Sequence, residues 1–143
     1  NDTQKSVPSG SEVSINSLEI SRQTAQRVWV PNRNGVFLNV GAAYAESSGA
    51  SMVIPGFNAE EAKTFPDNTS EFMSALDQSF CFSTATQVKT CCYTTQMNKT
   101  AIVRLGRQLQ VPFELLWPCY QAGAHWCEQC ESCQRFLRAM KEA

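Results

Sequence analysis

The sequence predicts an α/β protein in which helices and parallel strands form layers, followed by a metal-binding region at the C-terminal end. The first observation is an alternation of helix-like and strand-like segments between residues 29 and 116, which is typical of layered α/β domains. The second is a set of four cysteines within the fifteen residues 119–133. Together they predict one α/β portion and one small region organised by thiols.

Residues 1–28 are expected to form a polar tail or linker. They are rich in Ser, Thr and Gln, and Pro8 and Gly10 interrupt any regular pattern. We expect a short strand around residues 13–15 and only weak helical character over residues 19–27. Functional residues are not expected in this segment.

The first expected helix starts after Pro31 and ends near Gly49. A proline disfavours helix at the residue before it, and Asn32 or Asn34 is suited to cap a helix that follows. A glycine is suited to the position just beyond a helix end. The apolar residues between these limits fit a helix that packs on a sheet: Phe37, Leu38, Ala42, Tyr44 and Ala45.

The apolar run at residues 50–56 predicts a buried parallel strand. Ligands of open parallel sheets bind beyond the carboxyl ends of strands, so the polar residues that follow are candidates for a binding site: Asn58, Glu60, Glu61 and Asp67. The alternative is that Asp67 or Asn68 caps the next helix, with Glu71 completing a capping box. Both interpretations can hold together.

A second helix is expected over residues 70–82. A strand is expected within residues 84–95, and a further helix begins at Asn98. The first of these carries core-like residues at helical spacing: Phe72, Met73, Leu76 and Phe80. Cys91 and Cys92 lie in the strand region and are expected to be small buried hydrophobes. Lys99 stands at a helix start, where the helix dipole disfavours a cation. It is therefore either held for a phosphate or acidic partner or simply solvated.

The four C-terminal cysteines have the spacing C-x7-C-x2-C-x2-C. Zn²⁺ prefers four tetrahedral ligands, and a closed four-thiolate site has a structural role because it leaves no position for substrate. Cys127 and Cys130 would form a tight knuckle, Cys119 would reach it across a loop, and Cys133 would begin a helix over residues 132–141. Three alternatives remain open: disulfides, which seven cysteines cannot all form, an iron–sulfur cluster, and His125 in place of one thiol.

Composition narrows the function classes. The 143 residues suit one domain, 43% are hydrophobic and 17% are charged, which is ordinary for a globular protein. A net charge of −1 gives no electrostatic footprint for nucleic acid, and no run is long enough to span a membrane. There is no signal-peptide pattern, and clustered thiols favour a reducing, cytoplasmic environment. Because the chain begins with Asn1, we expect a piece of something longer.

Several segments, in this order, resemble the C-terminal half of the 7-cyano-7-deazaguanine synthase family, QueC or ExsB. The resemblance covers residues 29–138, and its most specific part is the cysteine spacing with the preceding Cys-Tyr. The segments that carry it are VPNRN at 30–34, AYAE at 43–46, GFNAEE at 56–61, FPD at 65–67, KTAIV at 99–103, WPCY at 117–120, and the last three cysteines with Gln134 and Arg135.

The resemblance implies a partial Rossmann-like ATP pyrophosphatase fold (adenine nucleotide alpha hydrolase-like) with a C-terminal zinc-binding region. The expected division is 1–28 tail or linker, 29–116 α/β portion and 117–143 zinc region. The implied activity is ATP-dependent conversion of 7-carboxy-7-deazaguanine and ammonia to the nitrile preQ0 in queuosine biosynthesis, through adenylation of the carboxylate. ATP with Mg²⁺ would serve the intact enzyme, and a homodimer or a missing N-terminal half are the further partners. No nucleic acid or membrane is implied.

Residue by residue, the resemblance implies that Cys119, Cys127, Cys130 and Cys133 bind zinc. It places substrate-binding positions at Arg33, Asn34, Asn58, Glu60, Asp67 and Lys99, and assigns no catalytic residue.

Two departures from the family pattern matter. The ATP-grasping loop Ser-Gly-Gly-x-Asp-Ser is absent, since Ser9-Gly10-Ser11 does not match it, and Asn68-Thr69 replace a common Cys-Arg pair. The chain is therefore expected either to be a synthase portion that is inactive alone, or to be a non-catalytic zinc-stabilised module that binds a ligand or a protein.

Overall fold

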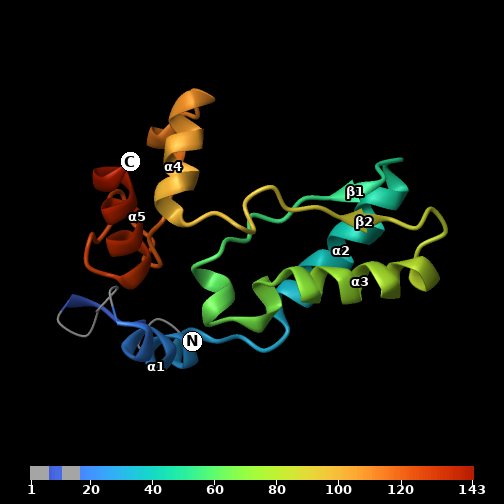
Figure 1. The fold of residues 1–143 in the computed structure, drawn as a ribbon, viewed down its shortest axis with the longest axis horizontal. Coiled ribbons are helices and arrows are strands. Elements are labelled where there is room, and N and C mark those ends of the chain that lie inside the picture. Colours follow the sequence, from blue (N-terminus) through green and yellow to red (C-terminus); the bar gives the residue numbers. More distant parts are fainter. Residues whose placement is uncertain (1–6, 11–16) are drawn as a thin grey trace. The chain divides into compact units, whose positions relative to one another are not determined.

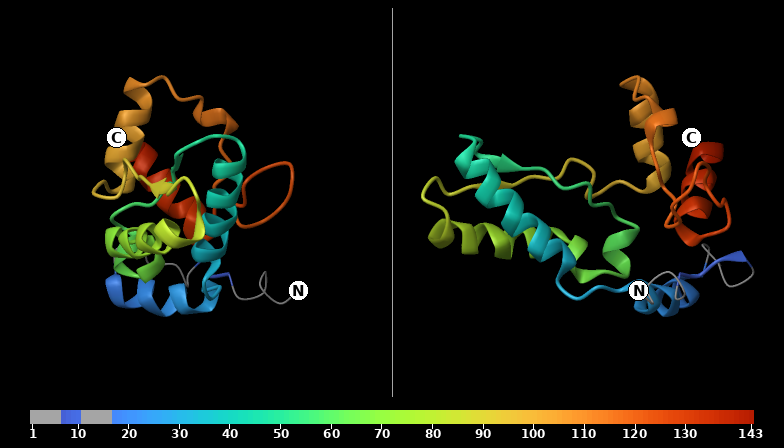
Figure 2. Two further views of the ribbon diagram at one scale, coloured as in Figure 1. Left: turned by 90° about the vertical axis from the view of Figure 1, so that its right-hand side faces the viewer. Right: turned by 180° about the vertical axis from the view of Figure 1, so that it is seen from behind.

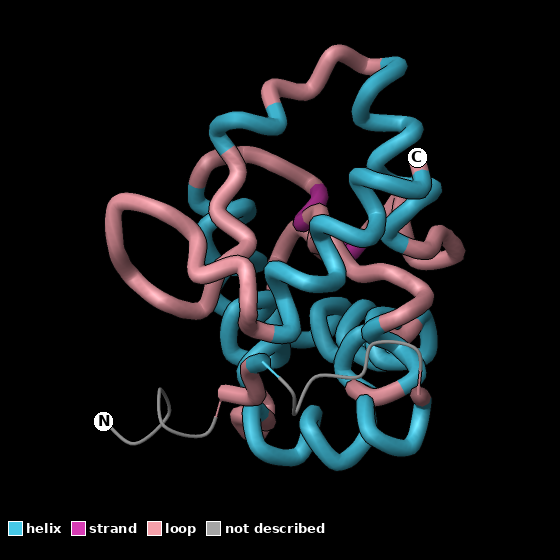
Figure 3. The backbone as a smooth tube through the Cα atoms, turned by 90° about the vertical axis from the view of Figure 1, so that its left-hand side faces the viewer, coloured by secondary structure: helices cyan, strands magenta, loops and turns pink. Residues whose placement is uncertain are grey.

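The computed structural model describes residues 7–10 and 17–143. Its residues form two compact units (Figure 1). Unit 1 comprises Asn1–Trp29 with Asn98–Ala143, and unit 2 comprises Val30–Met97. Helices and loops make up most of the described chain, and its only strands are two short ones, visible in Figure 3. The predicted combination of helices with parallel strands is confirmed, and the sheet of the described residues is small.

Unit 2 combines two helices with a pair of parallel strands. The strands are β1 (Met52–Val53) and β2 (Lys89–Thr90), which pair with Met52 opposite Lys89 and Val53 opposite Thr90. The helices are α2 (Arg33–Ser47) and α3 (Ser70–Ser83), with the short 3-10 turns η3 (Glu61–Lys63) and η4 (Pro66–Asn68) before α3. Helix α2 contacts β1 and α3 contacts β2, an arrangement that Figure 2 shows in two views.

The core of unit 2 is formed mainly by α2 and α3. Its buried members are Leu38, Ala42, Ala45, Phe57, Met73, Phe80 and Val88, and Phe72 and Leu76 pack against them. Gly41 lets α2 lie close to the sheet, because a Cβ there would stand 3.1 Å from Cγ1 of Val53. The expected core residues of the helix at 70–82 are confirmed.

Part of the predicted core is wrong. Phe37 and Tyr44 of α2 are 65% and 75% exposed, and Ile54, in the run expected to be buried, is 59% exposed. The apolar residues of α2 are distributed around all sides of the helix, but the two-stranded sheet can cover only one of these sides. The spacing of apolar residues therefore identified the helix but could not select the face that is buried.

Helix starts differ in detail from the sequence prediction. The cap of α3 is Thr69, whose Oγ1 accepts a hydrogen bond from the N–H of Phe72 at 3.2 Å, so neither Asp67 nor Asn68 has this role. Asn32 is the N-cap residue of α2 but is left-handed (φ 56°) and makes no side-chain cap bond. A Cβ at position 35 would collide with Oδ1 of Asn32, so a larger residue there would require the Asn32 side chain to move.

Unit 1 contains α1 (Leu18–Val28), α4 (Lys99–Gln108), the 3-10 turn η5 (Phe113–Leu115) and α5 (Glu131–Glu142). Helices α4 and α5 contact each other. Arg104 and Arg107 donate from Nη2 to the carbonyl oxygens of Glu142 and Met140, both at 2.9 Å, and so satisfy the last carbonyls of α5. Phe113 lies against Gly106, where a Cβ would stand 2.6 Å from Cζ of the ring.

The N-terminal segment is more regular than the sequence predicts. An eleven-residue helix, α1, occupies much of the expected linker, and Ser17 caps it by accepting from the N–H of Ile20 at 3.3 Å. The strand expected at residues 13–15 lies outside the described residues. The expected domain limits at 28 and 116 do not coincide with the limits of units 1 and 2, and that division stays a prediction. No described helix is both long enough and apolar enough to cross a membrane.

Candidate metal centre

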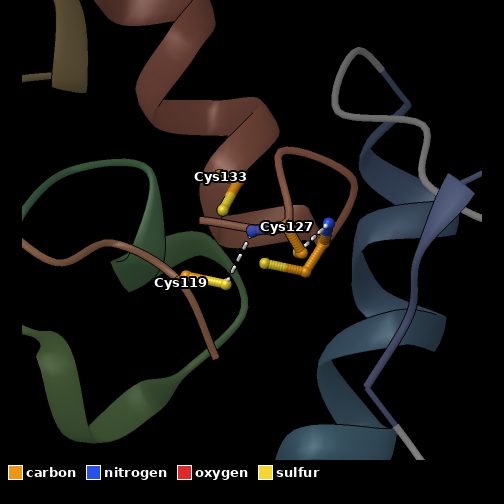
Figure 4. A group of neighbouring side chains, drawn as sticks. Cys119, Cys127 and Cys133 are labelled. Carbon is orange, nitrogen blue, oxygen red and sulfur yellow. Dashed lines mark hydrogen bonds between the residues drawn. The ribbon is translucent and has the colours of Figure 1, made fainter. Parts of the chain in front are cut away.

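Four sulfurs converge in unit 1. The Sγ atoms of Cys119, Cys127, Cys130 and Cys133 all lie within 4.8 Å of one another. Cys119 and Cys127 come from the loop between η5 and α5, Cys130 is the N-cap residue of α5, and Cys133 is in its first turn. Figure 4 shows Cys133 projecting from the helix and Cys119 from the loop, with their sulfurs turned toward Cys127.

Backbone amides surround two of these sulfurs. The N–H groups of Gln121 and Cys127 donate to Sγ of Cys119 at 3.3 and 3.4 Å, and the N–H of Cys130 donates to Sγ of Cys127 at 3.3 Å. Figure 4 marks two of these bonds with dashed lines. Hydrogen bonds from N–H groups favour the charged form of an acceptor, so this backbone is arranged to support thiolates.

The thiols differ in acidity. Burial raises the pKa of Cys127, but hydrogen bonds from the backbone of Cys130 and Gln129 outweigh it and lower that pKa to about 7. Burial, together with hydrogen bonds to the thiols of Cys130 and Cys119, raises the pKa of Cys133 above its usual value. In the absence of a cation, the cluster therefore favours negative charge on Cys127 and a proton on Cys133.

The cluster fits a tetrahedral metal ion. A Zn–S distance of about 2.3 Å places tetrahedral sulfurs about 3.8 Å apart, and the observed limit of 4.8 Å is close to this spacing. Cys119, Cys130 and Cys133 are buried, and Trp126 packs against them. The four cysteines could therefore hold a metal such as zinc. Thiolates at this spacing also suit an iron–sulfur cluster.

Neither a disulfide nor a histidine ligand finds support in the described part of the chain. All seven cysteines are described, and none forms a disulfide. His125 is exposed and lies outside the group of converging ligands.

Cys91 and Cys92, which the sequence predicts to be buried, are only half-buried. Of these two, Cys92 packs against the core of unit 2. Its Sγ lies 3.4 Å from the carbonyl oxygen of Phe57. Both cysteines belong to unit 2 and lie outside the group of converging ligands.

Sequence reasoning missed the contribution of residues 7–10. Val7 packs against the cysteine cluster and Pro8 is fully buried. Ser9 forms an antiparallel bridge with Cys130, next to a hydrogen bond from the N–H of Gly10 to the carbonyl oxygen of Gln129 at 3.1 Å. The only available signal was an apolar Val-Pro pair in an otherwise polar segment.

The predicted substrate-binding residues lie in both units. Arg33, Asn34, Asn58, Glu60 and Asp67 belong to unit 2, and Lys99, at the start of α4, belongs to unit 1. Asn34 and Asp67 are brought together, because Nδ2 of Asn34 donates to the backbone carbonyl of Asp67 at 3.3 Å. Asp67 is buried, and its Oδ1 accepts from Nδ2 of Asn68 at 3.1 Å.

Asn58 stabilises a local turn. Its buried side chain accepts at Oδ1 from the N–H groups of Glu60 and Glu61, at 3.1 and 3.0 Å, and so fixes the turn that leads into η3. Arg33 is exposed and Glu60 is half-buried. The roles of the six predicted residues in substrate binding stay a prediction.

Comparison with known proteins decides the family. A family model described as queuosine biosynthesis protein QueC matches residues 2–143. The chain belongs to the QueC family. A 7-cyano-7-deazaguanine synthase of Bdellovibrio bacteriovorus is 56% identical over 139 residues, which is 97% of this chain and 60% of the relative. The synthase of the same name from Pelotomaculum thermopropionicum is 48% identical over 137 residues, 96% of this chain and 62% of the relative.

A third relative shows the same partial coverage. A 7-cyano-7-deazaguanine synthase of Methanosarcina mazei is 45% identical over 122 residues, 85% of this chain and 53% of the relative. The resemblance expected from the sequence motifs is thus confirmed. The chain spans about 60% of the length of the first two QueC relatives.

Proposed function

We propose that this chain forms part of a 7-cyano-7-deazaguanine synthase. The observation that carries the proposal is the QueC match over residues 2–143, with relatives of that name at up to 56% identity. The converging cysteines agree with it, because they lie at the positions for which the sequence resemblance implied metal ligands.

The proposed reaction joins 7-carboxy-7-deazaguanine and ammonia with the use of ATP and Mg²⁺, in the cytoplasm. Attack of the carboxylate on ATP gives an acyl adenylate and pyrophosphate, and ammonia then displaces AMP to give the amide. A second adenylation, on the amide oxygen, releases pyrophosphate, and loss of AMP and a proton leaves the nitrile. The rest of a QueC-length protein would supply the ATP site of a Rossmann-like pyrophosphatase fold.

Unit 2 would contribute one wall of the substrate pocket. The bond between Asn34 and the backbone of Asp67 joins the start of α2 to the turn before α3, so that two of the proposed substrate residues share one support. Nδ2 of Asn58 would donate to the base, since its Oδ1 is used in the turn. Arg33, Glu60 and Lys99 would supply the remaining charged contacts.

The metal would be zinc with a structural role. Cys119, Cys127, Cys130 and Cys133 would fill its four positions, which leaves no open site for substrate. The ion would cross-link the loop to α5, and the reaction would take place away from the metal. A visible absorption spectrum separates zinc from an iron–sulfur cluster.

A second candidate is a non-catalytic zinc-stabilised module that binds a ligand or a protein. The observation in its favour is that the 143 residues contain no Ser-Gly-Gly-x-Asp-Ser loop. Without backbone amides arranged around pyrophosphate, this chain has no evident binding site for ATP.

A chimera tests both candidates. The matching segment of the Bdellovibrio bacteriovorus relative is replaced by this chain, and nitrile formation from 7-carboxy-7-deazaguanine, ATP and ammonium is followed by mass spectrometry. We expect turnover by the chimera and none by this chain alone. A chimera that folds, binds zinc and ATP, and forms neither amide nor nitrile would overturn the synthase proposal and favour the module. The unmodified relative serves as the positive control.

A further inference from the structure

We propose that the four-cysteine centre fastens residues 7–10 to the start of α5 when it holds metal, and that this docked segment in turn strengthens metal binding. The proposal rests on metal binding at the centre and is independent of synthase activity. The coupling is long-range, because it joins Val7 and Pro8 to residues 116–130 between η5 and α5, called here the ligand loop.

The docked segment forms an isolated antiparallel bridge with the ligand loop. The N–H of Gly10 donates to the carbonyl oxygen of Gln129 at 3.1 Å, and the N–H of Glu131 donates to the carbonyl oxygen of Pro8 at 3.3 Å. These two bonds lie on either side of the Ser9–Cys130 bridge. This is the pattern of a non-hydrogen-bonded antiparallel pair, in which the two central residues approach most closely.

One of these bonds also caps α5. The first amides of a helix have no partner within the helix, and the N-cap residue Cys130 makes no side-chain cap bond. The Pro8 carbonyl takes this place by accepting from Glu131, the first residue of the helix. The chain from 7 to 10 thus supports the same helix turn that carries Cys133.

The surface to which residues 7–10 bind depends on the sulfurs. The loop between η5 and α5 contains no helix or strand, and its backbone amides donate to Sγ of Cys119 and Cys127. A metal that joins these sulfurs to those of α5 would fix the backbone at residues 127–131. Its removal would release the carbonyl of Gln129 and the amide of Glu131, which hold residues 7–10.

The reverse effect follows from thermodynamic linkage. If metal binding favours docking of residues 7–10, docking must favour metal binding by the same factor. Val7 provides the physical means, because it places an apolar group at the cluster, while buried Pro8 holds the segment in place through its carbonyl bond to Glu131. Covering the sulfurs hinders approach of water and of competing ligands to the metal.

Amide hydrogen exchange of the unmodified chain tests the first half of the coupling. With Zn²⁺ bound, the Gly10 amide should be protected, and removal of Zn²⁺ with a chelator should accelerate its exchange at least about fivefold, the lower end of ordinary coupling between sites. Equal exchange of Gly10 in both forms would overturn the proposal. This measurement needs no substitution, so a variant that fails to fold cannot leave the proposal undecided.

Transfer of Zn²⁺ to a coloured chelator tests the second half. At equilibrium with the chelator, the double variant Val7→Ala/Pro8→Ala should bind Zn²⁺ at least about fivefold more weakly than the unmodified chain, with all four ligands intact. Ile20→Ala is the matched control: it removes a partly exposed apolar side chain from α1, outside the group that packs on the cysteines, and should leave the affinity for Zn²⁺ unchanged.

Each outcome has a distinct meaning. A folded double variant with an unchanged affinity for Zn²⁺ would contradict the coupling while leaving the metal site itself intact. A chain that binds no metal at all would instead contradict the metal assignment on which the coupling rests. Neither result depends on whether the chimera forms nitrile.

Discussion

Oδ1 of Asp77 accepts two hydrogen bonds from Thr90, one from its backbone N–H at 2.7 Å and one from its hydroxyl at 2.8 Å. The amides on either side, those of Lys89 and Cys91, donate to β1 and the residue before it. The Thr90 amide therefore belongs to the opposite edge of β2, and a carboxylate from α3 occupies it. Such a side chain blocks pairing with a further strand.

Asp77→Ala should destabilise unit 2 because it leaves the Thr90 amide without its acceptor. We expect a loss of about 1–3 kcal/mol in the free energy of unfolding, measured by urea denaturation followed by circular dichroism. Asp77→Asn is the matched control, since it keeps an oxygen acceptor and should lose clearly less. Equal losses in the two variants would show that hydrogen bonding to Thr90 is not what stabilises this edge.

Cys130→Ala should remove the metal and unfold residues 119–141. Loss of an outer-shell partner already reduces metal affinity about 10–100-fold, so loss of a direct ligand should exceed this range, and metal affinity here is also folding free energy. Zinc content by mass spectrometry and the thermal midpoint provide the measurement. Cys81→Ala, at an exposed cysteine outside the cluster, should retain both. Full zinc content in Cys130→Ala would exclude the four-cysteine site.

The purified chain should be colourless and carry one Zn²⁺. Zn²⁺ has a filled d shell and gives no visible band, whereas exchange for Co²⁺ should produce absorption from a tetrahedral thiolate site. A brown protein containing iron would establish an iron–sulfur cluster instead. The check is a visible spectrum together with metal analysis of the same sample.

Gly106→Ala should destabilise unit 1 despite the helical position. Alanine gains about 1 kcal/mol in helix propensity, but its Cβ would stand 2.6 Å from the Phe113 ring, and overpacking of this kind costs about 1–3 kcal/mol. In a Phe113→Ala background the clash is absent, so the same substitution should stabilise. Thermal unfolding of the four proteins gives the two differences, and the same sign in both backgrounds would contradict the contact.

The sequence was most informative where the relevant contacts are local. The four cysteines lie within fifteen residues, so their spacing alone predicted that their sulfurs would meet. The apolar residues of α3 likewise predicted a helix with a core face. Helix α2 was harder, because Phe37 and Tyr44 look as suited to a core as buried Leu38. Which face is buried depends on the sheet, and residue type does not reveal it.

Long-range contacts and the use of individual polar atoms could not be predicted. Pro8 is buried by a partner at the other end of the chain, and a Val-Pro pair carries no sign of this. Asn58 was expected to face a ligand, yet its Oδ1 closes a local turn. An asparagine can do either, and only the backbone path of its neighbours decides between them.

The bond between Pro8 and Glu131 closes a loop of more than 120 residues. The entropic cost of closing a loop rises only slowly with its length, but during synthesis the N-terminal partner emerges long before the C-terminal one. Residues 7–10 must therefore wait for the last helix and its cysteines to leave the ribosome. Unit 2, whose residues 30–97 lie between these partners, has its complete sequence available much earlier. Unit 1 therefore cannot be completed before the whole sequence of unit 2 has been synthesised.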